Sequence, residues 1–218
     1  MPDLLPHFMN ASTLKQRFIP ALRLFSNIFI IPRKEKKMKQ FNTKALAQAA
    51  MLLAICILSQ FFKNLSVYIT GPVINACLII CAATVGLGWA IMLSVVTPVT
   101  SYIITGSPIM SAIPLIIPCV MIGNVILAVC VALLKNKPNT KIGTVLSMLT
   151  GSVAKACFMG GVISVIIIPA LLPEKLTPNM KVFQMTFSLT QLITALIGSA
   201  FAYVIMIAIK AAMKHDGQ

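Results

Sequence analysis

A single lysine stands in the middle of a long apolar segment of this 218-residue chain, within the stretch GSVAKACFMGG at 151–161. The chain has only four acidic residues, and none of them lies in an apolar segment: Asp3, Glu35, Glu174 and Asp216. An ammonium group placed in hydrocarbon is unfavourable by at least about 2.5 kcal/mol. Lys155 must therefore face protein, water or a ligand, and an anionic ligand would supply the missing counter-ion.

Two structural explanations for Lys155 are also open. Its ammonium group could donate hydrogen bonds to backbone carbonyls that proline or glycine residues leave free. The side chain could instead extend along a shifted helix to the membrane surface. Lys141 and Lys155 are about 21 Å apart on a continuous helix, which is too far for comfortable contact with the nearer surface.

Other polar side chains in the apolar segments could complete a substrate-binding site with Lys155. These candidates are Asn75, Trp89, Thr100, Tyr102, Asn124, Gln184 and Gln191. Threonine and asparagine in membrane helices often serve only to join neighbouring helices by hydrogen bonds. Tryptophan and tyrosine often anchor a helix at the membrane surface, so both roles stay open for these residues.

The same residues do not favour covalent catalysis or metal chemistry. Lys155 could form a dyad with Ser152 or Ser164, but neighbours at those spacings on one helix rarely orient for catalysis. The six cysteines all lie in apolar segments, and the only histidines, His7 and His215, lie near the ends. A metal site needs three or four converging ligands. We therefore predict no catalytic residue, no metal and no cofactor.

The elements that position these residues are membrane-spanning helices. Hydrophobic residues make up 58% of the chain and charged residues 10%, whereas a soluble domain has about 25% charged residues. The apolar residues occur in runs of about twenty, the length at which a helix crosses a bilayer. The alternating segments of a spanning β-barrel do not occur. We predict an all-α integral membrane protein.

The apolar runs predict six transmembrane helices. The first extends from about Lys44 to Phe62, and the run over 72–105 is divided by the sequence Gly-Leu-Gly at 86–88, with Pro72 in a first helical turn. Three more are expected over 111–134, 142–172 and 182–213. The stretch 97–124 contains four prolines and two glycines, which at membrane depth indicate an interrupted helix beside a cavity.

The lysines between the spans predict that both termini are cytoplasmic. With six spans, seven lysines from residue 38 onward fall on the side of the termini and three on the other side, as the positive-inside tendency requires. Five spans would place the basic link at 135–141 on the outer side. We assign the formal net charge of +14 to topology and to contact with anionic lipid headgroups, and we expect no nucleic-acid partner.

Residues 1–37 differ in composition from the rest, because basic and apolar residues are mixed there. They form either a basic cytoplasmic extension or a leader upstream of the true start. Met38 begins the sequence MKQFNTKALAQAAMLLA, and the preceding Lys-Glu-Lys-Lys can be encoded by a ribosome-binding sequence with a spacer. Under both explanations, residues 38–218 form one six-helix membrane domain.

Residues 38–214 resemble the substrate-binding S components of energy-coupling-factor transporters, which take up vitamins and their precursors in prokaryotes. The resemblance rests on the six-helix length, the basic link before the fifth helix, the alanine-rich segment KALAQAAMLLA, and the run GLGWAIMLSVVTPVTSYIITGSPIMSAIPLIIPCVMIGN. It implies that the chain binds one small molecule at its outer side in a prokaryotic plasma membrane. It also implies three partner chains, a coupling transmembrane subunit and two ATP-binding subunits.

The resemblance further implies a docking surface on the first helix. In the family, an Ala-x-x-x-Ala face of this helix packs on the coupling subunit, and two pairs here have that spacing, Ala45 with Ala49 and Ala50 with Ala54. Small residues four positions apart allow helices to approach closely. The phosphate-binding Gly-x-x-x-x-Gly-Lys-[Ser/Thr] motif does not occur in the sequence, which agrees with ATP hydrolysis by other subunits.

Two other functions compete with this interpretation. A stand-alone secondary transporter would usually show internal repeats or coupling acids in its spans. An intramembrane hydrolase would need a serine or a histidine-acid constellation at membrane depth, and the predicted spans contain neither histidine nor acid. The same lack of acids favours an anionic ligand, such as a vitamin that bears a carboxylate.

Overall fold

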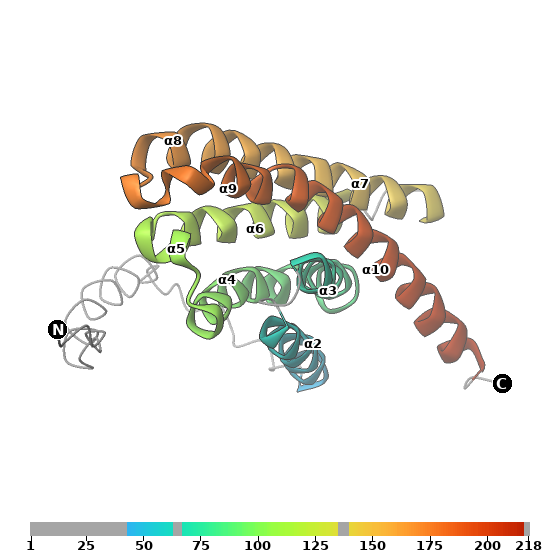
Figure 1. The fold of residues 1–218 in the computed structure, drawn as a ribbon. Coiled ribbons are helices and arrows are strands. Elements are labelled where there is room, and N and C mark those ends of the chain that lie inside the picture. Colours follow the sequence, from blue (N-terminus) through green and yellow to red (C-terminus); the bar gives the residue numbers. More distant parts are fainter. Residues whose placement is uncertain (1–42, 63–66, 135–139, 216–218) are drawn as a thin grey trace, which may run out of the picture. The chain divides into compact units, whose positions relative to one another are not determined.

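Six long apolar helices make up the part of the chain that the structure describes, residues 43–62, 67–134 and 140–215 (Figure 1). In this computed structural model, each of the six is long and apolar enough to cross a membrane, and the described residues contain no strand. The predicted all-helical fold and the number of spans are therefore confirmed. The side of the membrane on which the termini lie stays a prediction, and residues 1–37 lie outside the described residues.

Several spans are built from more than one element, and the labels used here are those of Figure 1. In chain order the described elements are α2 (Thr43–Phe61), α3 (Val67–Ile80), the π-helical η1 (Cys81–Val85), α4 (Leu87–Thr105), α5 (Pro108–Ala112), α6 (Ile116–Leu134), α7 (Thr140–Met159), the π-helical η2 (Gly160–Ile167), α8 (Ile168–Leu171), the 3-10 helix η3 (Glu174–Asn179), α9 (Met180–Phe187) and α10 (Leu189–His215).

The second and third spans are divided as predicted, but the second begins earlier. Gly86 alone separates η1 from α4, and its φ of 138° belongs to a region that favours glycine. Pro72 lies inside α3 instead of in its first turn, because the helix already begins at Val67. The predicted start of the second span at Pro72 was wrong, because the helix already includes the five residues before the proline. The proline only removes the helical hydrogen bond to the carbonyl of Tyr68.

The interruption predicted within 97–124 lies between α4 and α6. Gly106 ends α4 with a φ of 55°, and its N–H donates to the carbonyl of Tyr102 at 2.9 Å. The short α5 and a turn follow, while Pro98 stays within the continuous α4. The sixth span is also interrupted, at Ser188 between α9 and α10. No proline or glycine marks that second break, so it could not be predicted from the residue pattern.

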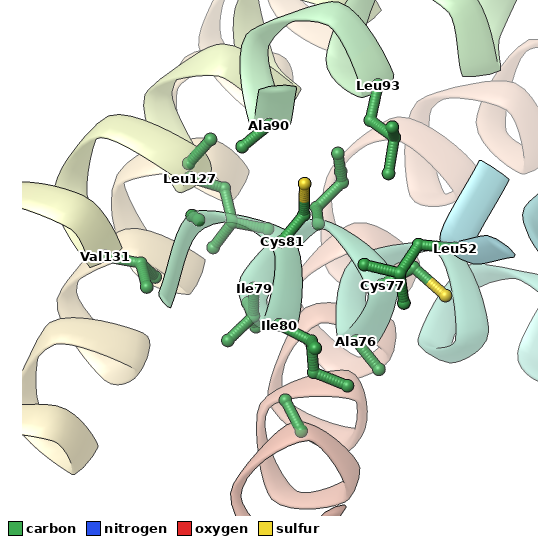
Figure 2. Packing of buried hydrophobic residues seen from close by; sticks show 14 of the residues in the cluster. Leu52, Ala76, Cys77, Ile79, Ile80, Cys81, Ala90, Leu93, Leu127 and Val131 are labelled. Atoms are coloured by element: carbon green, nitrogen blue, oxygen red, sulfur yellow. The ribbon is translucent and has the colours of Figure 1, made fainter. Parts of the chain in front are cut away.

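Two hydrophobic cores lie at different levels of the bundle. The larger joins α2, α3, η1, α4, α6, α7 and α10, and Figure 2 shows Cys81 and Leu127 among its members. The smaller joins α5, η2, α8 and α9 with the beginning of α6. Along α7, Met148 belongs to the larger core and Met159 to the smaller one. Lys155 lies between these two methionines on α7.

The predicted orientation can be tested by cysteine labelling in intact cells. The six native cysteines are first replaced, so that the introduced thiol is the only one that can react. We expect Thr177→Cys, on the exposed η3, to react with a membrane-impermeant maleimide. Lys137→Cys, which lies outside the described residues, should react only after permeabilisation. Reaction at position 137 in intact cells would overturn the orientation with cytoplasmic termini.

Candidate functional site

Lys155 on α7 is bound to two asparagine side chains from other helices. Its Nζ donates to Oδ1 of Asn75 on α3 at 2.6 Å and to Oδ1 of Asn124 on α6 at 2.8 Å. The lysine is 3% exposed, so its side chain does not extend to the surface. Its bonds go to side-chain amides instead of the free backbone carbonyls that we considered. We call Lys155, Asn75 and Asn124 the lysine cluster.

The lysine cluster contains no group that would neutralise an ammonium charge on Lys155. Amide oxygens offer dipoles without charge, and Glu174 is the only acidic residue in the described part of the chain. It is exposed in η3, whereas Lys155 is buried and bonds to the two asparagines. An ammonium group has three N–H donors. The two asparagine oxygens account for two of them, and the structure gives no third acceptor among the described residues.

Close packing of α10 on α3 fixes the position of Asn75. A Cβ atom added at Gly198 would lie 2.7 Å from the Cβ of Asn75 and 2.7 Å from the carbonyl oxygen of Pro72. Gly123, next to Asn124, is similarly close to Met159, whose side chain would lie 2.8 Å from an added Cβ. At Gly198 the neighbouring backbone leaves no room for a side chain, whereas at Gly123 the Met159 side chain would have to shift.

We expect Gly198→Ala to destabilise the bundle and to weaken ligand binding. The added methyl group forces α10 away from α3 or displaces Asn75, and overpacking of this kind is unfavourable by about 1–3 kcal/mol. Thermal unfolding of the purified protein measures the effect. Gly88→Ala is the matched control, because Gly88 is exposed in α4 and an added Cβ meets nothing within 4 Å. Equal stability of the two variants would contradict the close contact.

A cavity of about 250 Å³ adjoins the lysine cluster. All three cluster members line it together with Gln191 of α10, and the remaining walls come from α3, α4, α5, α6 and α9. It lies where α3, α6 and α9 begin and where α4 ends. This is the end of the bundle opposite to the start of α2, since successive spans reverse direction. In the predicted orientation, this end faces outward.

The structure brings four of the predicted binding residues to the cavity and leaves four outside its lining. Lys155, Asn75, Asn124 and Gln191 line it, whereas Trp89, Thr100, Tyr102 and Gln184 are not among the lining residues. Trp89 packs against the larger core. The hydroxyl of Thr100 donates to the carbonyl of Thr97 at 3.0 Å, and the hydroxyl of Tyr102 accepts from Ser111 at 3.4 Å.

Gln184 joins two elements that flank the cavity. Its Nε2 donates to the carbonyl of Ser164 at 3.0 Å, and the Ser164 hydroxyl donates to the carbonyl of Gln184 at 2.9 Å. The two bonds connect α9 to η2. They are of the kind that joins neighbouring membrane helices, which was the second role left open for these polar residues. Gln184 therefore positions α9, which in turn lines the cavity with other residues.

Sequence reasoning missed part of the cavity wall. Thr70 lines it but precedes the expected start of the second span, so it was not considered. Ser101 lies one turn after Thr97 on α4, and this spacing could have indicated a shared face. Phe183 and Phe187 on α9 also line the cavity. They too are one turn apart, but their position depends on the direction of α9. That direction changes at Ser188, where no proline or glycine indicates a break.

The four docking alanines of α2 fall into different environments. Ala49 is 3% exposed and belongs to the larger core, and Ala45 is half-buried. Ala50 and Ala54 are both exposed. In addition, α2 is the least buried of the six spans. Only the second pair, Ala50 with Ala54, is therefore free to contact another chain.

A second and larger hollow, of about 640 Å³, lies between α2, α3 with η1, and α10. Its walls are almost entirely apolar, with Gln48 and Thr84 as the polar residues among those that line it. None of these lining residues is charged. Recognition of a polar ligand requires placed polar groups, so the smaller cavity beside Lys155 is the better candidate for a binding site.

Comparison with known proteins finds no match to this chain among protein-family models, curated proteins or solved structures. A functional proposal therefore rests on the geometry of the lysine cluster, its cavity and the exposed face of α2.

Proposed function

We propose that this chain is the membrane-embedded, substrate-binding subunit of an ATP-driven uptake system for a vitamin or vitamin precursor. The observation that carries the proposal is a buried lysine, held only by neutral amides, at the wall of a cavity at one end of a six-helix bundle. Such a site provides a counter-charge for a small anion. The proposed location is the prokaryotic plasma membrane, with the cavity facing outward.

The surroundings of Lys155 favour binding over catalysis. The hydroxyl groups of Ser152 and Ser199 share a hydrogen bond at 3.0 Å, and the hydroxyl of Ser164 donates to the carbonyl of Gln184 at 2.9 Å. Neither serine is thus paired with Lys155, whose own bonds go to the two asparagines. A nucleophilic serine needs a base within hydrogen-bond distance. The proposal accordingly assigns the chain no enzymatic activity of its own.

The exposed face of α2 supports a role as one subunit of a larger assembly. Ala50 and Ala54 lie on this face and allow a partner helix to approach closely. We propose that the partner is a coupling transmembrane subunit, which joins this chain to two ATP-binding subunits. The described spans contain one acid, Glu174, which is exposed in η3 at the start of the sixth span, and no buried acid that could couple transport to a proton or sodium gradient. This observation favours the subunit over a stand-alone secondary transporter.

Affinity purification of the tagged chain from its native cells tests the proposal. We expect a transmembrane protein and two proteins with phosphate-binding motifs to be recovered in defined ratio. Uptake in vesicles should depend on ATP inside and should survive dissipation of ion gradients. A chain that purifies alone and transports only while an ion gradient is present would identify a secondary transporter instead.

A further inference from the structure

The charge and size of the cavity beside the lysine cluster indicate which class of ligand fits it. Any inference about the ligand rests on the proposed function, because it assumes that this cavity is the binding site. We infer that the ligand is a compact monocarboxylate of roughly ten non-hydrogen atoms, bound with its carboxylate at Lys155. Charge, size and the character of the remaining walls each support one part of this inference.

The charge of the ligand follows from the donors of the lysine cluster. Because Asn75 and Asn124 turn their oxygens toward Lys155, the NH2 group of each amide points away from the lysine. All three residues line the cavity, and these NH2 groups and the third N–H of the ammonium group are the donors that the cluster's own bonds leave for a ligand. A carboxylate accepts several such bonds, and bonds to charged groups are the stronger ones. A cluster rich in donors therefore selects an anion.

A single carboxylate matches the single cation at this wall. Lys155 is the only charged residue among the cavity-lining residues that the structure describes. A second carboxylate would lie without a counter-charge in a largely apolar space, and burial of an unpaired charge is strongly unfavourable. We therefore expect a monoanion.

The size of the ligand follows from the cavity volume of about 250 Å³. An apolar protein cavity of about 150 Å³ is known to hold benzene, which has six non-hydrogen atoms. The same packing gives roughly ten non-hydrogen atoms in the present cavity. One ring with a carboxylate has that size, while a molecule with several fused rings exceeds it.

The walls away from Lys155 suit an apolar body. Phe183 and Phe187 on α9 face the cavity with Ile74, Pro98 and Met110 from other elements. The Thr97 hydroxyl also lies at this wall, but it donates to the carbonyl of Leu93 at 2.8 Å and so has no free donor for the ligand. A ring packs favourably against such aromatic and aliphatic side chains.

Three probes separate charge from size when their binding to the purified full-length chain is measured by thermal unfolding and calorimetry. We expect sodium benzoate to bind saturably, with sodium chloride at equal ionic strength as the reference. Benzamide has the same shape without the charge and should bind at least about 30-fold more weakly, the smallest loss expected for one partner of a buried charge pair. Pyrenecarboxylate carries the charge on a much larger ring system and should not bind.

Amide-to-acid variants locate the binding site within the cavity. Asn124→Asp and Asn75→Asp each place a carboxylate beside Lys155 in almost the same volume, so the chain supplies its own counter-ion. Both variants should remain folded and lose benzoate binding. Asn179→Asp is the matched control, because Asn179 is exposed and is not among the residues that line the cavity. It should bind benzoate like the parent.

The outcomes distinguish this inference from the proposed function. Equal binding of benzamide and benzoate, tight binding of pyrenecarboxylate, or no benzoate binding up to about 10 mM would each overturn the ligand class, even if the ATP-binding partners are recovered. Unchanged benzoate binding in folded Asn124→Asp and Asn75→Asp would also overturn it. Benzoate binding by a chain that purifies without ATP-binding partners would support the ligand class and contradict the uptake-system proposal.

Discussion

Replacing Lys155 by glutamine is expected to abolish ligand binding while the helical bundle stays folded. Glutamine is one bond shorter, but its NH2 group can still donate to the oxygens of Asn75 and Asn124, which now accept from the lysine at 2.6 and 2.8 Å. The substitution removes the charge and the third N–H donor, and it keeps the two donors that hold the asparagines. Truncation of one partner of a buried charge pair weakens binding by about 2–5 kcal/mol, which corresponds to a loss of roughly 30-fold to several thousand-fold.

Lys155→Met separates the charge of the lysine from its hydrogen bonds. Methionine removes an unpaired buried charge, which by itself is stabilising. It also leaves two buried amide oxygens without their donor, and each unsatisfied group is unfavourable by about 1–3 kcal/mol. We therefore expect Lys155→Met to unfold at a lower temperature than Lys155→Gln, although both lose ligand binding.

Thermal unfolding without ligand and calorimetric titration with benzoate measure the two effects. If Lys155→Gln binds as tightly as the parent, the charge has no part in recognition and Lys155 serves only to join α7 to α3 and α6. The anionic-ligand proposal would then fail with it. If Lys155→Met is as stable as Lys155→Gln, the two asparagine oxygens must find other donors.

The spans could be predicted from the sequence because their determinants are local. Runs of about twenty apolar residues define each span whatever its neighbours are. Gly86 likewise marks the division between the second and third spans, since a φ of 138° favours glycine. The isolated charge of Lys155 was equally visible, because few residues are as unfavourable in an apolar helix.

The partners of Lys155 could not be predicted because they depend on the packing of three helices. Asn75 and Asn124 lie 80 and 31 residues away in sequence, and their approach depends on the relative rotation of α3, α6 and α7. Both were candidate binding residues, but the pattern of one helix does not say which face meets another helix. The direction of the Gln184 amide, toward Ser164 and η2, was hidden for the same reason.

Exposure also separates residues that share one motif on α2. Ala49 and Ala50 are adjacent in sequence and each belongs to an alanine pair with the same spacing. The helix directs Ala49 into the larger core, where it is 3% exposed, and directs Ala50 outward. Sequence spacing alone gave both pairs equal standing as docking candidates. In the structure, Ala49 of the first pair packs inside the bundle, and only the second pair, Ala50 with Ala54, is fully accessible.

Replacing Ala50 by phenylalanine is expected to abolish uptake while ligand binding and folding are retained. A bulky ring on the exposed face of α2 prevents the close approach of a partner helix, and in lipid such close packing is a main source of helix association. The cavity lies at the opposite end from the start of α2, and Ala50 is not among its lining residues. Binding of benzoate by the purified variant should therefore equal that of the parent.

Two further alanine variants give this experiment its controls. Ala200→Phe introduces the same ring on an exposed position of α10 and should leave uptake unchanged. Ala49→Phe overfills the larger core, where overpacking is unfavourable by about 1–3 kcal/mol or more, and should reduce folding and uptake together. Uptake, recovery of the ATP-binding partners and benzoate binding are measured for all three. Normal uptake by Ala50→Phe would exclude this face of α2 as the docking surface. Loss of benzoate binding together with uptake, in a folded Ala50→Phe protein, would show that docking and binding do not use separate surfaces.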